Sequence, residues 1–169
     1  MIIPLFIIGS SLHFVYNWSN HNKKVAVIAA VNESYWEHIK IAFWPLIVLY
    51  ALEYALGGYA ISSFIPSCTI SLYIVPITMV STVFLYKHFV KRNILWVDIS
   101  LFLVTITIAQ VVSHLILDEL SASILTNVIS FAFLFFILTA FLVFTTNPPK
   151  EPDIFKDPLT EKYGIKGHK

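Results

Sequence analysis

The sequence predicts an all-α fold, a polytopic transmembrane helix bundle with five spans. Hydrophobic residues make up 57% of the 169 residues and charged residues only 12%, whereas about a quarter of a soluble domain is charged. Five apolar runs are each long enough for a helix rising about 1.5 Å per residue to cross about 30 Å of hydrocarbon. Every Lys and Arg can also be placed on one side of a membrane. Composition, run length and charge asymmetry therefore all indicate a membrane-spanning helix bundle.

The first two runs are both expected to form helices. The first covers residues 2–18, and neither a basic stretch nor a small-residue cleavage site marks it as a signal peptide, so we expect it to persist as a helix. The second covers residues 35–56 and follows Ser34, a typical N-cap residue. It contains Pro45, which removes a backbone hydrogen bond and should kink the helix.

The remaining runs cover residues 66–86, 94–117 and 123–145. Pro66 suits the first turn of a helix, whereas Pro76 lies inside its run and should kink it. Residues 147–169 are rich in Pro and charge and lack apolar periodicity, so we expect them to run irregularly beneath the membrane. The predicted organisation is a transmembrane domain, residues 1–146, followed by a cytoplasmic tail, residues 147–169.

Positive charge sets the predicted orientation. Lys and Arg occupy the first gap, the third gap and the tail, with one further Lys near the start of the second run, and the second and fourth gaps hold none. Because basic loops stay in the cytoplasm during insertion, the N-terminus should lie outside and the C-terminus inside. Aromatic residues that favour the interface fall at the same cytoplasmic boundary: Trp18, Trp36, Tyr86 and Trp96.

We therefore expect a multi-pass protein of the cell membrane. Anionic inner-leaflet lipids are the expected partners of its basic loops, and they explain the basic face more simply than nucleic acid, which we exclude. Cys68 is the only cysteine, so an internal disulfide and a cysteine-rich metal site are excluded. The tail could bind a protein partner, and a homo-oligomer is equally compatible with the sequence.

The densest chemistry lies at the start of the second run. Ser34 and Glu37 have the spacing of a capping box, in which each side chain bonds the backbone N–H of the other residue. Glu33 and Glu37 also suit the positive end of the helix dipole, and Lys40 can extend to the interface. This assignment leaves His38 without a structural role. We define the inner polar cluster as His13, Asn32, Glu33, Glu37 and His38.

His13 is the expected companion of His38. It lies five residues before the end of the first run, and His38 lies a similar distance inside the second, so the two rings should have comparable depth. With Glu33 or Glu37 they form a set adequate for zinc or another divalent metal, and the two imidazoles alone could bind haem axially. A hydrogen-bonded structural network between helix ends is the competing interpretation.

The fourth run carries a second group of polar residues, spaced by three, four or seven along one helix face. Ionisable groups in a span usually line an interior or a water-filled cavity, and a pair of Glu53 and His114 could relay protons or hold a cation. Hydrogen bonding between helices is the alternative. We define the outer polar stripe as Glu53, Gln110, His114, Asp118 and Asn127.

Two segments resemble a known family. Residues 12–19, LHFVYNWS, and residues 31–40, VNESYWEHIK, are similar to small bacterial integral membrane proteins grouped as a domain of unknown function, with a V-N-E-S-x-W-E-H-x-K signature. Residues 155–165, FKDPLTEKYGI, resemble the same family. The resemblance implies no activity, but it implies that the tail folds back as a defined element. It also implies which positions to test first: His13, Asn32, Glu33, Trp36, Glu37 and His38.

Three functions stay open at this point. We favour small-solute or ion handling, for which the inner polar cluster and the outer polar stripe could form the two ends of a polar path. A metal- or haem-dependent membrane enzyme would use the inner His and Glu residues. An accessory or scaffold protein needs only stable packing and the tail. We lean away from an enzyme, because no nucleophile has an evident base partner and no nucleotide loop is present.

Overall fold

The computed structural model describes residues 1–90 and 94–167 and contains five α-helices without a β-strand in these ranges. The all-α prediction is therefore confirmed. The helices are α1 (Ile2–Trp18), α2 (Tyr35–Ala55), α3 (Phe64–Phe89), α4 (Leu95–Glu119) and α5 (Ile124–Thr146). Four short 3₁₀ helices complete the described chain: η1 (Val25–Val27), η2 (Gly58–Ala60), η3 (Asp153–Phe155) and η4 (Gly164–Gly167).

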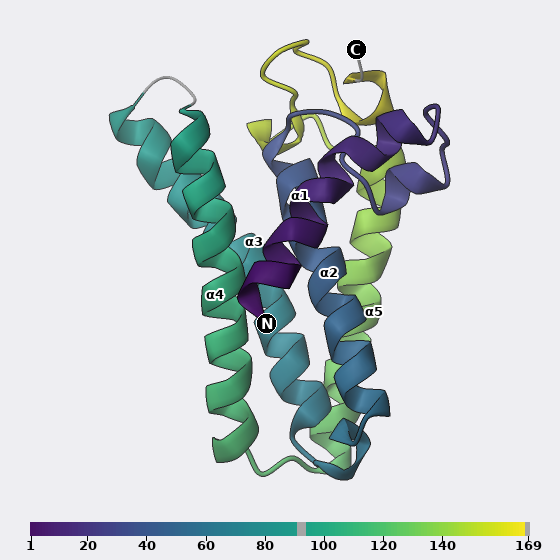
Figure 1. Cartoon of the computed structure of the whole chain (residues 1–169), viewed down its shortest axis with the longest axis vertical. Coiled ribbons are helices and arrows are strands. Elements are labelled where there is room, and N and C mark those ends of the chain that lie inside the picture. The colour runs from purple at the N-terminus through teal and green to yellow at the C-terminus, as the bar shows by residue number, and fades with distance from the viewer. Residues whose placement is uncertain (91–93, 168–169) are drawn as a thin grey trace.

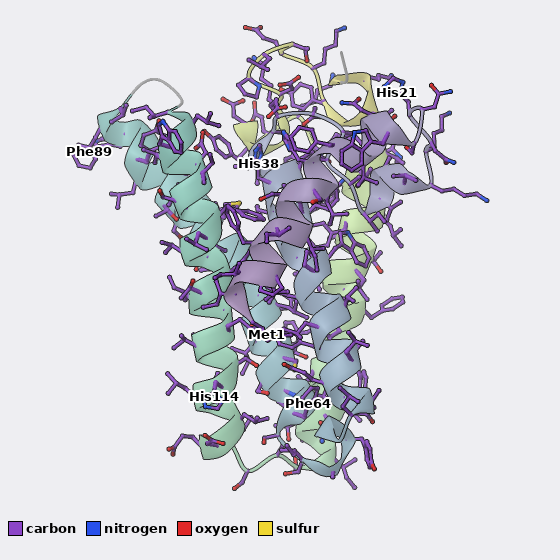
Figure 2. The ribbon with its side chains drawn as sticks, in the orientation of Figure 1. Met1, His21, His38, Phe64, Phe89 and His114 are labelled. Atoms are coloured by element: carbon purple, nitrogen blue, oxygen red, sulfur yellow. The ribbon has the colours of Figure 1, made fainter. Side chains whose placement is uncertain are left out.

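Helices α2 to α5 form an elongated bundle, and each has a stretch long and apolar enough to cross a membrane (Figure 1). The 17-residue α1 is shorter and lies obliquely across α2 and α4. Met1, the residue before α1, lies near the middle of the bundle (Figure 2). The predicted orientation of the two termini relative to a membrane stays a prediction.

The connections alternate between the two ends of the bundle. Residues 19–34, the end of α3, the start of α4 and residues 147–167 of the tail lie at one end, which we call the basic end (Figure 1). Residues 56–63 and 120–123 lie at the opposite end, which we call the far end, and they contain no Lys or Arg. The alternation predicted from charge thus matches the helix directions, although Lys91, Arg92 and Lys169 lie outside the described residues.

The core of the bundle is apolar and closely packed. Phe43, Leu46, Val75, Ile106 and Phe141 are completely buried. Such packing is strong only where helices approach closely, because dispersion attraction falls steeply across a gap.

At Gly9, α1 touches both of the helices that it crosses. A Cβ there would lie 2.6 Å from Phe102 Cζ and 2.8 Å from the Ile41 carbonyl oxygen. The smallest side chain therefore permits this crossing, which brings the end of α1 to the start of α2.

The tail packs against the basic end, which corrects the composition-based prediction that it runs irregularly beneath the membrane. Phe155 is buried, with its ring 5.0 Å from Trp36 and 5.4 Å from Phe144 between centroids. Asp157 is also buried and accepts hydrogen bonds from the Leu159 N–H and the Thr160 hydroxyl. The defined tail implied by the family resemblance is thus present, and it covers the start of α2.

Candidate functional site

The structure brings together three side chains of the inner polar cluster, each from a different segment. His13 comes from α1, Glu33 from the connection after α1, and His38 from α2. Figure 2 shows His38 at the basic end. His13 Nε2 lies 3.2 Å from Glu33 Oε1, and the two imidazole centroids are 5.4 Å apart. One potential ligand atom from each residue lies within 4.8 Å of the others. All three side chains are partly buried.

Hydrogen bonds fix the connection that carries Glu33. The Ala30 N–H donates to the Leu12 carbonyl at 3.3 Å, which ties the connection to the end of α1. The Asn32 carboxamide accepts from the Ser34 N–H at 2.9 Å and donates to the Gly164 carbonyl at 2.9 Å. Asn32 therefore joins the connection to the tail and does not line the group formed by His13, Glu33 and His38.

Glu37 lies apart from this group and has a structural role. Its carboxylate pairs with Lys40 Nζ at 2.5 Å and accepts from the Val31 N–H at 3.0 Å. The Ser34 hydroxyl accepts from the Glu37 N–H at 3.4 Å, so Ser34 is the predicted N-cap. The other half of the predicted capping box is not formed, because the Ser34 N–H donates to Asn32 Oδ1 instead of the Glu37 carboxylate. Glu33, and not Glu37, is thus the carboxylate that accompanies the histidines.

Lys40 differs from its prediction as well. It is completely buried and does not extend to the interface. Its Nζ donates to the Ala26 carbonyl at 2.7 Å and to the Thr145 hydroxyl at 3.3 Å, in addition to pairing with Glu37. A buried ammonium needs such partners, because charge removed from water is costly unless it is paired and hydrogen-bonded.

The orientation of His38 suits metal binding. Its Nδ1 lies 2.9 Å from the Ser34 carbonyl oxygen, so Nδ1 carries the proton and donates. In the neutral ring this leaves the lone pair of Nε2 available, which is how backbone carbonyls orient metal-bound histidines. His13 Nδ1 is buried and has no hydrogen-bond partner among the described residues, while Nε2 faces Glu33. His38 therefore offers a nitrogen that the fold has not saturated, and His13 would exchange the contact of Nε2 with Glu33 for a bond to the metal.

The donor set fits a small divalent metal. Metal–nitrogen and metal–oxygen bonds of about 2.0–2.2 Å place tetrahedral ligand atoms about 3.4 Å apart. The pair His13 and Glu33 already has this separation, and the 4.8 Å limit on the trio requires only a small inward movement. Three protein ligands leave a coordination position open for water or a substrate oxygen, as in catalytic zinc sites.

A haem does not fit between these histidines. Axial ligation places the macrocycle between two imidazole nitrogens, but the His13 and His38 ring centroids are only 5.4 Å apart. Glu33 also occupies the space beside His13 Nε2. Of the two cofactors considered from sequence, the arrangement of the side chains supports a divalent metal.

Two adjoining cavities flank the three side chains. One, of about 260 Å³, is lined by Glu33, His38, Tyr35, Asp98 and two tail residues, among others. The second, of about 230 Å³, is lined by His13, His38 and mainly apolar side chains of α1 and α4. Both cavities share His38, Leu95, Asp98 and Phe102 as walls. A ligand on His38 can therefore extend in either direction.

The outer polar stripe divides into two parts. Glu53, Gln110 and His114 line a cavity of about 290 Å³ at the far end. Gln110 donates to the Tyr50 hydroxyl at 3.1 Å, which lies 2.6 Å from the Ser71 hydroxyl. Ser71 donates in turn to the Ala109 carbonyl at 2.7 Å, so this part joins three helices by hydrogen bonds.

Asp118 and Asn127 do not join that cavity. Asp118 is exposed, and Asn127 donates to the Ser123 carbonyl at 3.2 Å and the Ser62 carbonyl at 3.4 Å. Asn127 thus links the two connections at the far end. The periodicity of the stripe predicts a shared helix face but gives no information about which positions meet a cavity.

The family of unknown function DUF6512 matches residues 1–165. The chain belongs to this family. No curated protein and no solved structure matches the chain. Membership in DUF6512 therefore covers the helices, the connection with Glu33 and the tail, but it assigns no activity to any of them.

Two residues outside both predicted groups border the site. Tyr35 and Asp98 line the larger of the two inner cavities together with Glu33 and His38. Asp98 lies in the first turn of α4, distant in sequence from α1 and α2. Its signal in the sequence is a carboxylate next to an apolar run, which a helix N-terminus explains equally well.

Proposed function

We propose that the chain is a multi-pass membrane protein whose working site is a divalent metal held by His13, Glu33 and His38 at the basic end. The observation that carries this proposal is the convergence of three ligand-type side chains from α1, the following connection and α2 within 4.8 Å. Two imidazoles and one carboxylate with an open position are a known donor set for zinc and non-haem iron.

Such a site can bind and polarise an oxygen atom. A metal in the open arrangement acts as a Lewis acid and lowers the pKa of a bound water. Tyr35 and Asp98 line the adjoining cavity and are groups that can exchange protons with a bound ligand. The proposed function is therefore metal-dependent chemistry on a ligand in these cavities, which favours an enzyme over a scaffold.

Small-solute or ion handling is the second candidate. The far-end cavity with Glu53, Gln110 and His114 favours it, because ionisable groups in apolar helices often line ion paths. Between this cavity and the inner polar cluster the core contains buried Leu46, Val75 and Ile106. Transport would require this layer to open. An uptake assay in vesicles with His114→Asn would test it, and unchanged uptake would reject this candidate.

Metal binding by purified protein tests the main proposal. Metal-stripped protein in detergent is titrated with Co²⁺ and Zn²⁺, and a single equivalent is expected to bind. His13→Asn, Glu33→Gln and His38→Asn should each weaken binding at least about 100-fold, since losing even an outer partner of a metal ligand costs about 10–100-fold.

His114→Asn is the matched control, because it removes an imidazole from the far end of the same chain. Its metal affinity should equal that of the wild type. All variants are compared at equal monodispersity and helix content, so that misfolding does not imitate ligand loss. Undiminished binding in His13→Asn and His38→Asn would overturn the proposal.

The predicted orientation is part of the proposal, with the basic end in the cytoplasm. The clustering of Lys23, Lys24 and the tail lysines at one end supports it. Reporter fusions active only inside or only outside the cell, placed after residues 60 and 167, test it. The fusion after residue 60 should report outside and the other inside, and the reverse pattern would reject the orientation.

A further inference from the structure

The two inner cavities lie where the helices separate. At the basic end α3 and α4 lean away from α1 and α2 (Figure 1), and the cavities are lined from both sides of this separation. Each cavity is smaller than the roughly 300–1,000 Å³ of pockets that hold a whole small molecule. Since they share four wall residues, they are compartments of one binding site with His38 between them.

The compartments differ in chemistry. The smaller one is bounded by Phe6, Phe14, Ile99 and Phe102, and the ionisable groups on its wall, among the residues that the structure describes, are His13, His38 and Asp98. The larger one is lined by Glu33, Tyr35 and Asp98 together with the apolar Met79 and Val83. A ligand that fits both therefore has an apolar part and a polar part.

The apolar compartment is bordered by side chains that the protein itself leaves uncovered. Phe14 is 51% exposed and Leu95 68% exposed, although both are large and apolar. They lie on α1 and α4, and α4 is long and apolar enough to cross a membrane. In a bilayer such side chains face acyl chains, so this compartment is accessible from the lipid phase.

On the other side, the tail forms part of the wall. Pro158 and Leu159 line the larger cavity, and the buried Asp157 fixes their turn through bonds to Leu159 and Thr160. The polar compartment is thus bordered by the tail, and the apolar compartment lies between α1 and α4.

We infer that the site takes a long-chain lipid amphiphile from the bilayer, with its chain in the apolar compartment and an oxyanion head at the metal. This inference rests on the proposed metal function. Glu33 and Asp98 place carboxylates on the cavity wall, and a metal there would supply the positive charge that attracts an anionic head. Binding of the amphiphile should therefore require the metal.

The test uses stearate as the probe and the absorption spectrum of Co²⁺-loaded protein in detergent as the readout. Coordination of the stearate carboxylate should change the cobalt spectrum. Acetate carries the same head without the chain, and it should need at least about a hundredfold higher total concentration, because acyl chains concentrate in the apolar phase. Metal-free protein should not retain stearate beyond the detergent background.

Two adjacent serines supply a matched pair of variants. Ser10 lines the apolar compartment, whereas Ser11 lies about 100° further round α1 and donates to its own helix at Ile7. Ser10→Phe should bind Co²⁺ normally, but the stearate response of its cobalt spectrum should be weakened at least about tenfold. The reason is that the phenyl ring fills space that the acyl chain needs. Ser11→Phe should match the wild type in both measurements.

The outcomes separate the inference from the proposal on which it rests. Co²⁺ binding with a stearate response that Ser10→Phe alone removes supports both. Co²⁺ binding with equal responses to acetate and stearate, or with no loss in Ser10→Phe, overturns the lipid inference and leaves the metal proposal standing. Failure of wild-type protein to bind Co²⁺ overturns both.

Discussion

The buried pair of Glu37 and Lys40 should be the most sensitive polar contact in the bundle. Lys40 is completely buried, Glu37 is 1% exposed, and their charged atoms are 2.5 Å apart. Lys40→Met keeps most of the volume but leaves the Glu37 carboxylate with the Val31 N–H and without its cation. Removing one partner of a buried ion pair costs about 3–5 kcal/mol, and we expect a loss of that size in the free energy of unfolding.

The companion variant removes both charges. In Glu37→Gln/Lys40→Met no buried ion is left unpaired, so only ordinary hydrogen bonds are lost, at about 1 kcal/mol each. The main losses are the bonds from Lys40 to the Ala26 carbonyl and the Thr145 hydroxyl. The double variant should therefore be more stable than Lys40→Met alone, although it carries one more substitution.

Reversible unfolding in mixed detergent micelles, followed by tryptophan fluorescence, measures both effects. Lys156→Met is the matched control, because the partly buried Lys156 pairs at 3.5 Å with Glu161, which is largely exposed. Loss of this pair should change the free energy of unfolding by less than about 1 kcal/mol. The reasoning is refuted if Lys40→Met is as stable as Lys156→Met, or if the double variant is less stable than Lys40→Met.

Three further perturbations test other contacts. Gly9→Ala should cost about 1–3 kcal/mol in unfolding free energy, because its Cβ would lie 2.8 Å from the Ile41 carbonyl, and an unchanged unfolding curve would contradict this crossing geometry. Gly164→Ala should loosen the tail, since φ is +55° and the Cβ would lie 2.8 Å from the Thr145 carbonyl. Limited proteolysis should then cut the tail faster than in wild type, and equal rates would contradict the docking. Tyr50→Phe should cost about 1 kcal/mol, because Ser71 and Gln110 lose a shared partner, while Co²⁺ binding stays unchanged. A change in Co²⁺ affinity would show that the two ends are coupled.

The sequence was sufficient for the helices because their signals are local. Apolar length, the Ser34 cap and the alternation of basic gaps are each properties of short segments. Helix boundaries differ from prediction by at most three residues, as at the end of α3, where the helix continues to Phe89 instead of residue 86. That last turn carries polar residues, which a hydropathy pattern assigns to a loop.

The side-chain contacts at the basic end were less predictable because they join distant segments. Equal depth in two helices predicted that His13 and His38 could meet, and they do. Depth could not decide between Glu33 and Glu37, because Glu33 lies just before α2 and Glu37 lies in its first turn. That choice depends on Lys40, whose partners Ala26 and Thr145 are 14 and 105 residues away in sequence. Composition likewise could not reveal that Phe155 packs on Trp36.

These contacts also explain why Glu33 faces His13. Glu37 fixes one side of residue 32 through the Val31 N–H, and the Ser34 cap fixes the other side. Asn32, between them, is tied to Gly164 of the tail. The backbone that carries Glu33 is thus held by bonds at residues 31, 32 and 34, and a metal ligand on a backbone fixed in this way is better positioned for binding. The buried ion pair and the docked tail are therefore the structural support of the proposed metal centre, not a second function.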